Sequence, residues 1–323
     1  MFFMKGHLSK IDRNLLQLLE INARKPVSFF AKKLRVSRAT IDFRMNSLIK
    51  RGIITGFHTV LNLPALGRLY CRVFIRYERA TEQDEKEFIE YLKKLKGIGW
   101  IAISEGKWDL TFILMVDSIQ ELHSAYSRIL RDHHSIIKEK ELSILVQLHH
   151  FNHDYLYDIK DNISLKFSNK KSMLDIDETD MKILHHLSQD SRMSTLKIAE
   201  NLKLAANTVK NRIKRLEKER IILAYRPSIN ISAIGFNHYK VFLELEQKSR
   251  DDLNKLISYL SSSPNVVYIS EVLGSADLEF EVDLSSHHEL NRFMRELRTR
   301  FPTVIRNYQT MLHLSEPLIK YLP

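Results

Sequence analysis

The chain has 323 residues, a net charge of +11 and a single cysteine, Cys71. One cysteine excludes an intrachain disulfide and is typical of a reducing compartment. No apolar run approaches the ~20 residues of a membrane-spanning helix, and the start Met1-Phe2-Phe3-Met4-Lys5 is too short for a secretory signal. We therefore expect a cytoplasmic protein of several domains, without a membrane partner.

The positive charge is concentrated in two segments. Residues 9–67 carry a net charge of +8 (11 Lys and Arg against 3 Asp and Glu), and residues 177–235 carry +4 (11 against 7). Residues 68–150 and 151–176 are neutral, and residues 236–323 carry −2. This segregation is typical of a polyanion-binding element joined to a neutral domain. Lysines that merely keep small helical domains soluble are the alternative interpretation.

The first basic segment predicts three short helices. Leucines at helical spacing begin near residue 15, Pro26 interrupts the pattern, and residues 27–34 continue it. Ser37 is placed to cap a third helix over residues 38–50. Residues 53–61 then predict a short hairpin-like strand pair. Helix, helix, tight turn, helix and wing is the winged helix-turn-helix plan, in which the third helix can enter a major groove of DNA.

The neutral segment that follows alternates between strand and helix periodicity. The expected elements lie at residues 70–77, 82–95, 98–104, 110–116, 119–130 and 136–148. This βαββαβ order predicts a ferredoxin-like domain, whose antiparallel sheet is covered by helices on one face only. Residues 151–173 are expected to form a mostly polar linker, although Tyr155, Leu156, Tyr157 and Ile163 can pack.

The sequence then repeats itself. A shift of 168 places residues 12–67 on residues 180–235 without a gap, with 15 identities in 56 pairs. The same shift aligns Gly106 and Asp109 with Gly274 and Asp277. One chain therefore carries two copies of a two-part module. We expect an α+β protein with these domains: winged helix-turn-helix 1–67, ferredoxin-like 68–150, linker 151–173, winged helix-turn-helix 174–235 and ferredoxin-like 236–323.

The uncovered faces of the two sheets need a partner. Strand residues such as Cys71, Val73 and Val241 suggest that these uncovered faces are apolar. We expect the two sheets to pack face to face within the chain, as an intrachain pseudo-dimer.

The two third helices supply the candidate DNA contacts, because Asn, Lys and Arg read base edges and bind phosphates. The candidates in the first copy are Ser37, Arg38, Thr40, Asp42, Phe43, Arg44, Asn46 and Lys50, and those in the second are Asn207, Thr208, Lys210, Asn211, Arg212, Lys214, Arg215 and Lys218. Asp42 stands where Lys210 stands, and Ala205 replaces the capping serine. The two reading helices are therefore not expected to be equivalent. A docking module without DNA contact is the alternative.

No catalytic constellation is evident in the sequence. The paired histidines are neighbours in the chain, so their side chains point apart on a regular element, and no Gly-rich phosphate loop is present. His149 and His153 could share a metal, but no Cys or carboxylate at ligand spacing supports this. We therefore predict no catalytic residue, metal or cofactor, and a protein that is not an enzyme.

Each module resembles the Lrp/AsnC family of transcription regulators. The resemblance rests on Ile11-Asp12, Leu15-Leu16, Asn22-Ala-Arg24, Phe30-Ala31, Ser37, Thr40, Arg44, Leu48, Gly52-Ile53-Ile54, Gly67 and Gly106-x-x-Asp109, and on Asp177, Asp180, Ile183-Leu184, Arg192, Ile198-Ala199, Thr208, Arg212, Leu216, Ile221-Ile222, Gly235 and Gly274-x-x-Asp277. It implies a DNA-binding domain, a ligand-sensing domain that dimerises through its sheet, and further self-association.

The resemblance also implies a small effector, commonly an amino acid, near Gly106, Asp109, Gly274 and Asp277. A turn that merely joins two strands is the alternative. Ordinary members of the family carry one module per chain, so the fusion predicts two unlike half-sites about one helical turn, or a multiple of it, apart. Two rival functions remain open: a siroheme decarboxylase, because those enzymes share this two-domain architecture, and a sensor that has lost DNA binding.

Overall fold

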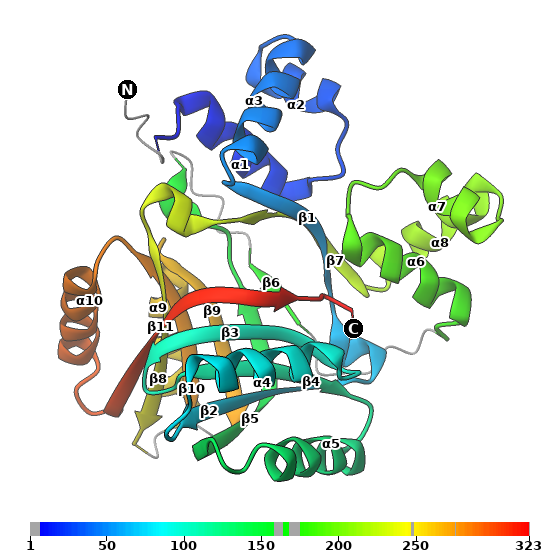
Figure 1. The fold of residues 1–323 in the computed structure, drawn as a ribbon. Coiled ribbons are helices and arrows are strands. Elements are labelled where there is room, and N and C mark those ends of the chain that lie inside the picture. Colours follow the sequence, from blue (N-terminus) through cyan, green and yellow to red (C-terminus); the bar gives the residue numbers. More distant parts are fainter. Residues whose placement is uncertain (1–6, 158–163, 168–174, 247–248, 275, 323) are drawn as a thin grey trace.

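The structure is a computed structural model that describes residues 7–157, 164–167, 175–246, 249–274 and 276–322. Two three-helix units lie on one side of a large sheet, and four further helices cover the outside of that sheet (Figure 1). The α+β class is as predicted. Within the described ranges, no helix has both the length and the apolar character needed to cross a membrane.

The first helix-turn-helix unit consists of α1 (Lys10–Asn22), α2 (Val27–Leu34) and α3 (Arg38–Lys50). Ser9 and Asp12 form a capping box at the start of α1, which satisfies free backbone amides of the first turn. The predicted cap of α3 is confirmed, since the Ser37 hydroxyl accepts a hydrogen bond from the Thr40 amide at 3.0 Å. Ile41, Met45 and Leu48 turn inward to the core.

The second unit repeats this plan with α6 (Glu178–Gln189), α7 (Thr195–Leu202) and α8 (Ala206–Lys218). Asp177 and Asp180 form the corresponding capping box. Ala205 begins α8 without a side-chain cap, so the two third helices start differently, as predicted.

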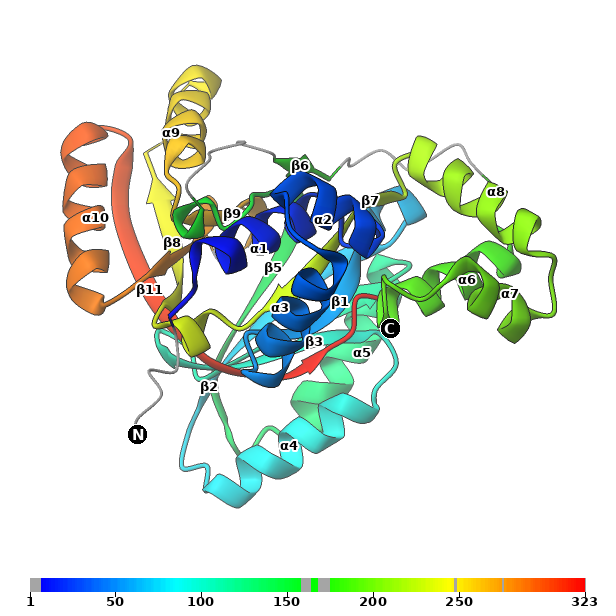
Figure 2. The same ribbon diagram turned by 90° about the horizontal axis from the view of Figure 1, so that it is seen from above.

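The predicted wing hairpin is wrong. Each copy contributes one strand, β1 (Ile54–Leu61) or β7 (Ile222–Ile229), and these two strands pair antiparallel with each other. A single strand leaves its backbone amides and carbonyls unpaired. Here the counterpart from the other copy satisfies them. The resulting ribbon lies between the two helix-turn-helix units (Figure 2).

Reciprocal hydrogen bonds show that the two units are related by a pseudo-twofold axis. The Ala23 amide donates to the Tyr225 carbonyl at 2.8 Å, and the Ser191 amide donates to the Phe57 carbonyl at 2.9 Å. The two bonds differ by the repeat offset of 168 at both ends. Backbone bonds of this kind join the two units directly, independently of the sheet domains.

The ferredoxin-like order predicted for each neutral segment is confirmed. The first domain contains β2 (Leu69–Tyr77), α4 (Glu82–Lys94), β3 (Ile98–Gly106), β4 (Leu110–Val116), α5 (Ile119–Asp132) and β5 (Ile137–His150). The second contains β8 (Asn237–Leu245), α9 (Arg250–Ser262), β9 (Val266–Leu273), β10 (Leu278–Leu284), α10 (His287–Arg300) and β11 (Ile305–Ile319). Short elements complete the chain: η1 (Leu63–Leu66), η2 (Asp154–Leu156), β6 (Leu165–Lys166) and η3 (Ile231–Ile234).

The two sheets are joined at their edges as well as facing each other. β5 pairs with both β2 and β9, and β11 pairs with both β8 and β3, so eight strands close into a ring. Phe74 and Phe242 meet inside this ring of strands, and the centroids of their two phenyl groups lie 5.2 Å apart. Among the described strands, closure leaves no unpaired edge between the two domains, a feature that was not predicted from the sequence.

The interior of the ring contains buried charges beside a small apolar cluster of Phe74, Trp108, Phe242 and Met311, so the apolar interior expected from Cys71, Val73 and Val241 is corrected in part. Strand alternation turns these three residues toward the covering helices. The opposite face carries buried charged side chains, including Arg72 and Lys240. Face-to-face packing within the chain is therefore present, and it includes the ion pair between Arg72 and Glu279 as well as the contact between Phe74 and Phe242.

The predicted linker packs in its first part. Leu156 and Tyr157 are buried, and Tyr155 is half-buried. Ile163, the segment 168–172 and the opening residues 1–5 lie outside the described residues.

Candidate nucleic-acid interface

The outer face of α8 is exposed and positively charged. Val209, Ile213 and Leu216 face the core, so the polar residues between them turn to solvent. The exposed side chains are Asn207, Thr208, Lys210, Asn211, Lys214, Arg215, Glu217 and Lys218. Five of the predicted contacts on this helix can thus approach DNA as amides or ammonium groups.

The outer face of α3 has a different character. Its exposed side chains are Arg38, Ala39, Asp42, Phe43, Asn46, Ile49 and Lys50. Burial and the charge of Arg24 lower the pKa of Arg192 in the other unit, while Asp190 and, more weakly, Asp42 act against this decrease. The charge of Asp42 is thus a minor contribution at this cation of the second helix-turn-helix unit.

Arg44 and Arg212 occupy equivalent positions and have an internal role. Arg44 lies 3.7 Å from Asp12, and Arg212 donates to Asp180 at 2.9 Å and to Asp177 at 2.7 Å. Arg215 also pairs with Asp180. These arginines bind each reading helix to the capping box of its first helix. Their predicted contacts with phosphate stay a prediction.

The missing cap of α8 gives a first testable prediction. Ala205→Ser should raise the free energy of unfolding by about 1 kcal/mol, because a serine hydroxyl can accept a hydrogen bond from a free backbone amide of the first turn. Ser37→Ala should lower it by a similar amount, since this removes the bond to Thr40. Urea denaturation of the two variants measures both changes. If both substitutions changed the free energy of unfolding in the same direction, the assignment of the caps would be contradicted.

The Gly-x-x-Asp loops stand at the junction between the two domains. Gly106 has φ of 121°, and a Cβ there would lie 2.8 Å from the Thr310 carbonyl oxygen of the other copy. The Asp109 carboxylate accepts the Tyr77 amide at 2.7 Å. Gly274 and Asp277 make the corresponding contacts with Leu142 and Leu245. The geometry gives both loops a structural role, and effector binding there stays a prediction.

A polar segment after β5 joins the first helix-turn-helix unit to the second sheet domain. Glu20 of α1 is buried and accepts hydrogen bonds at 2.6 Å from both His153 Nδ1 and the Tyr157 hydroxyl. His153 Nε2 lies 3.8 Å from Asp283 of β10. Burial opposes ionisation of Glu20, but His153, Arg226 and Tyr157 together outweigh burial and lower the Glu20 pKa to about 2. The sequence offered no signal for a role of Glu20.

The ring interior contains a second buried ionic cluster. Lys240 Nζ lies 2.7 Å from Glu279 and 2.9 Å from Glu281, and Arg72 Nη1 lies 2.6 Å from Glu279. Burial opposes the charged form of Glu281, but Lys240 and its neighbours hold the pKa of this carboxyl well below its usual value. The acidic residues alternate with apolar residues along β10, a pattern that could have been noticed in the sequence.

His238 extends this cluster and makes it sensitive to pH. Its Nδ1 lies 2.6 Å from Asp283, and its Nε2 lies 3.2 Å from Glu281. Burial disfavours the imidazolium, but the two carboxylates outweigh burial and raise the His238 pKa to about 10.

A raised pKa means that the His238 interaction stabilises the fold fully below about pH 6.5 and is lost as the pH rises toward about 10. The stability difference between wild type and His238→Gln should therefore be larger at about pH 6 than at about pH 9. Urea denaturation at both pH values measures this difference. A difference that does not change with pH would contradict the ion pairs assigned to His238.

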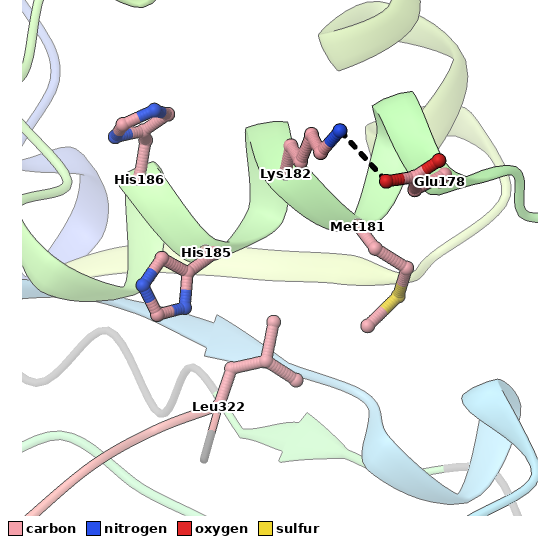
Figure 3. Close-up of a pocket in the computed structure, with 6 residues that line it drawn as sticks. All are labelled: Glu178, Met181, Lys182, His185, His186 and Leu322. Carbon is pink, nitrogen blue, oxygen red and sulfur yellow. Dashed lines mark ion pairs between the residues drawn. The ribbon is translucent and has the colours of Figure 1, made fainter.

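Residues after β5 cover one face of α1, but the corresponding face of α6 is open. Arg13 of α1 donates to the Leu156 carbonyl at 3.2 Å, so residues after β5 cover it. On α6 a hollow of about 280 Å³ is found instead, and Leu322 forms one wall of it. Met181 and His185 are directed toward Leu322 (Figure 3). The two modules therefore differ beyond their reading helices.

The histidines singled out as metal candidates have other partners. His149 Nε2 lies 2.9 Å from the Gln147 amide nitrogen, and His153 Nδ1 bonds to Glu20. Among the described residues, no group of three or more His, Cys, Asp or Glu side chains is arranged to hold a metal ion.

The fold therefore defines a chain of helix-turn-helix units fused to ferredoxin-like domains, and comparison with known proteins identifies the family. Residues 176–217 match the AsnC-type helix-turn-helix domain. Residues 240–322 match the Lrp/AsnC ligand binding domain.

Related proteins from archaea support the same assignment. An uncharacterized HTH-type transcriptional regulator of Pyrococcus abyssi is 31% identical over 116 residues, which cover 36% of this chain and 77% of the relative. The HTH-type transcriptional regulator Ptr1 of Methanocaldococcus jannaschii is 30% identical over 115 residues, which cover 36% of this chain and 76% of the relative. The chain belongs to the Lrp/AsnC family of transcription regulators.

Solved structures of an enzyme resemble the chain over nearly its whole length. The crystal structure of the siroheme decarboxylase NirDL has a TM-score of 0.64 and 12% identity, and the match covers 98% of this chain and 95% of NirDL. The sequence-based expectation that this protein is not an enzyme is therefore corrected, because an enzyme shares the complete architecture. At this identity the likeness concerns the fold.

Proposed function

We propose that the protein is a regulator that binds double-stranded DNA in a sequence-specific way and reads two unlike half-sites with α3 and α8. The observation that carries the proposal is the exposed cationic face of α8, with Lys210, Lys214 and Lys218 turned to solvent. Such a face matches the phosphates that flank a major groove. Membership of the Lrp/AsnC family supports the same function.

The single-chain arrangement gives this function a geometric basis. The β1–β7 ribbon and the reciprocal bonds hold the two helix-turn-helix units about a pseudo-twofold axis. In twofold DNA-binding proteins, two reading helices contact half-sites about one helical turn apart. Because α3 and α8 expose different residues, we expect the two half-sites to differ in sequence. The chain would thus act as the counterpart of a dimer, and further self-association is part of the proposal.

The match to a ligand-binding domain supports modulation by a small effector such as an amino acid. The Gly106–Asp109 and Gly274–Asp277 loops are the proposed location, since they lie where strands of the two domains meet. Isothermal titration with a panel of amino acids tests this part. Saturable heat that is lost in Asp109→Asn and Asp277→Asn would support it, and absence of heat for every amino acid would contradict it.

Salt dependence tests the DNA proposal directly. Fluorescence anisotropy with labelled duplexes should show affinity falling steeply between about 50 and 200 mM salt, since each phosphate contact releases condensed counterions. Failure to bind any duplex at about 50 mM salt would contradict the proposal and would favour a sensor without DNA contact.

The second candidate is a siroheme decarboxylase-like activity, which the full-length likeness to NirDL favours. A tetrapyrrole with several carboxylates needs free cationic side chains. In the described ring interior, Arg72, Lys240 and His238 already face Glu279, Glu281 and Asp283, so we rank this function second. The absorbance spectrum of the protein after addition of siroheme tests it: a shifted, saturable spectrum would support binding, and an unchanged spectrum would oppose it.

A further inference from the structure

Phe43 is the most exposed large apolar side chain among the described residues, at 67% of its surface. It lies on the outer face of α3, whose exposed residues also include Asp42, Asn46 and, at the two ends of the helix, Arg38 and Lys50. Exposing a phenyl ring to water loses the free energy that its burial would supply. Its pseudo-equivalent on α8 is Asn211, which is polar. The same position of the two reading helices therefore presents opposite chemistry.

One charged side chain, that of Arg44, lies close to the Phe43 ring. The Arg44 guanidinium carbon lies 5.9 Å from the Phe43 ring centroid, within the range of a cation–π contact. Arg44 is in turn paired with Asp12, which belongs to the capping box of α1. A side chain that is ordered before binding loses less conformational entropy when it binds. The contact with Arg44 therefore favours one position of the Phe43 ring on the exposed face of α3.

We infer that Phe43 is a specificity-determining residue that contacts the methyl group of a thymine in the half-site read by α3. This inference rests on the proposed function. A phenyl ring cannot donate or accept an ordinary hydrogen bond, and the thymine methyl is the apolar feature that base pairs present in the major groove. The cations on the same helix, Arg38 and Lys50, suit the adjoining phosphates better than an apolar protein partner.

The pseudo-equivalent Asn211 extends the argument to the difference between the half-sites. An asparagine amide can form two hydrogen bonds with adenine N6 and N7, whereas a phenyl ring can only pack against a methyl group. At this position, discrimination by α8 therefore depends on polar groups of a base, and discrimination by α3 depends on a methyl group. The two half-sites should respond differently to removal of that methyl.

The test replaces thymine by deoxyuridine, which lacks the methyl group, one position at a time in a duplex that the wild-type protein selects. One replacement in the half-site assigned to α3 should weaken wild-type binding about 4-fold, as expected for one buried carbon. Phe43→Ala should bind this duplex equally well with thymine or deoxyuridine. Asn211→Ala should keep the wild-type sensitivity, as should Leu273→Ala, which truncates an equally exposed leucine (65%) in β9.

The outcomes separate this inference from the proposed function. If no duplex binds, the DNA function itself fails. If duplexes bind but no deoxyuridine replacement weakens binding, the role of Phe43 is overturned while DNA binding stands. The same holds if Phe43→Ala still loses affinity when thymine is replaced by deoxyuridine. Sedimentation velocity provides a further check: a change in oligomeric state on Phe43→Ala, without a change in the response to deoxyuridine, would assign the ring to a protein contact and overturn the inference.

Discussion

Lys240→Met should lower the free energy of unfolding by about 3–5 kcal/mol, because it leaves buried carboxylates without one of their cations. Lys240 is only 1% exposed and lies between Glu279 and Glu281. Methionine preserves most of the side-chain volume, so the lost charge dominates the effect. Urea denaturation followed by circular dichroism measures the change.

Two further variants show whether the charge is responsible. Lys255→Met removes an exposed lysine of α9 and should change stability by no more than about 0.5 kcal/mol. Lys240→Met combined with Glu279→Gln should recover part of the loss, because one of the unpaired charges is then removed. A loss of less than about 1 kcal/mol in Lys240→Met would show that the buried carboxylates do not depend on the charge of Lys240 as described.

The triple substitution Lys210→Ala, Lys214→Ala and Lys218→Ala should weaken DNA binding roughly 100-fold at about 0.1 M salt, if each lysine contributes about 1 kcal/mol. It should also reduce the slope of log affinity against log salt by about 3, since three phosphate contacts are lost. Alanine preserves helix formation in α8, so folding should be retained. Anisotropy titrations at several salt concentrations measure both quantities.

A matched control removes the same charge elsewhere. Lys86, Lys94 and Lys96 are exposed lysines in or just after α4, on the first sheet domain. Their replacement by alanine should change affinity and salt slope little, because they lie away from both reading helices (Figure 1). Equal losses in the two triple variants would show that the protein responds to net charge and not to the α8 face.

Local signals were sufficient to predict most elements of the fold. Helical spacing of leucines and the position of Ser37 identified the first helix-turn-helix unit, and the 168-residue offset extended that assignment to the second. Family membership followed from residues spread over both copies. These features depend on neighbours within one turn or one strand, which a sequence displays directly.

The contacts between the two copies were not predictable in the same way. Pairing of β1 with β7 joins residues that are far apart in the chain, so the wing was mistaken for a local hairpin. The charged residues inside the ring lie on the strand faces that turn away from the helices. Val73 was assigned to that inner face from the sequence, but it lies on the face covered by the helices. Arg44 and Arg212 illustrate the same difficulty at the candidate site, since their exposure to phosphate depends on pairing with Asp12 and Asp180.

The most direct test is selection of bound duplexes from a random library by the intact chain, followed by sequencing. The two different reading helices on one pseudo-twofold scaffold predict an enriched site with two unlike half-sites, separated by about 10 base pairs or a multiple of that spacing. Enrichment of a perfect palindrome, or of no sequence at all, would contradict the account.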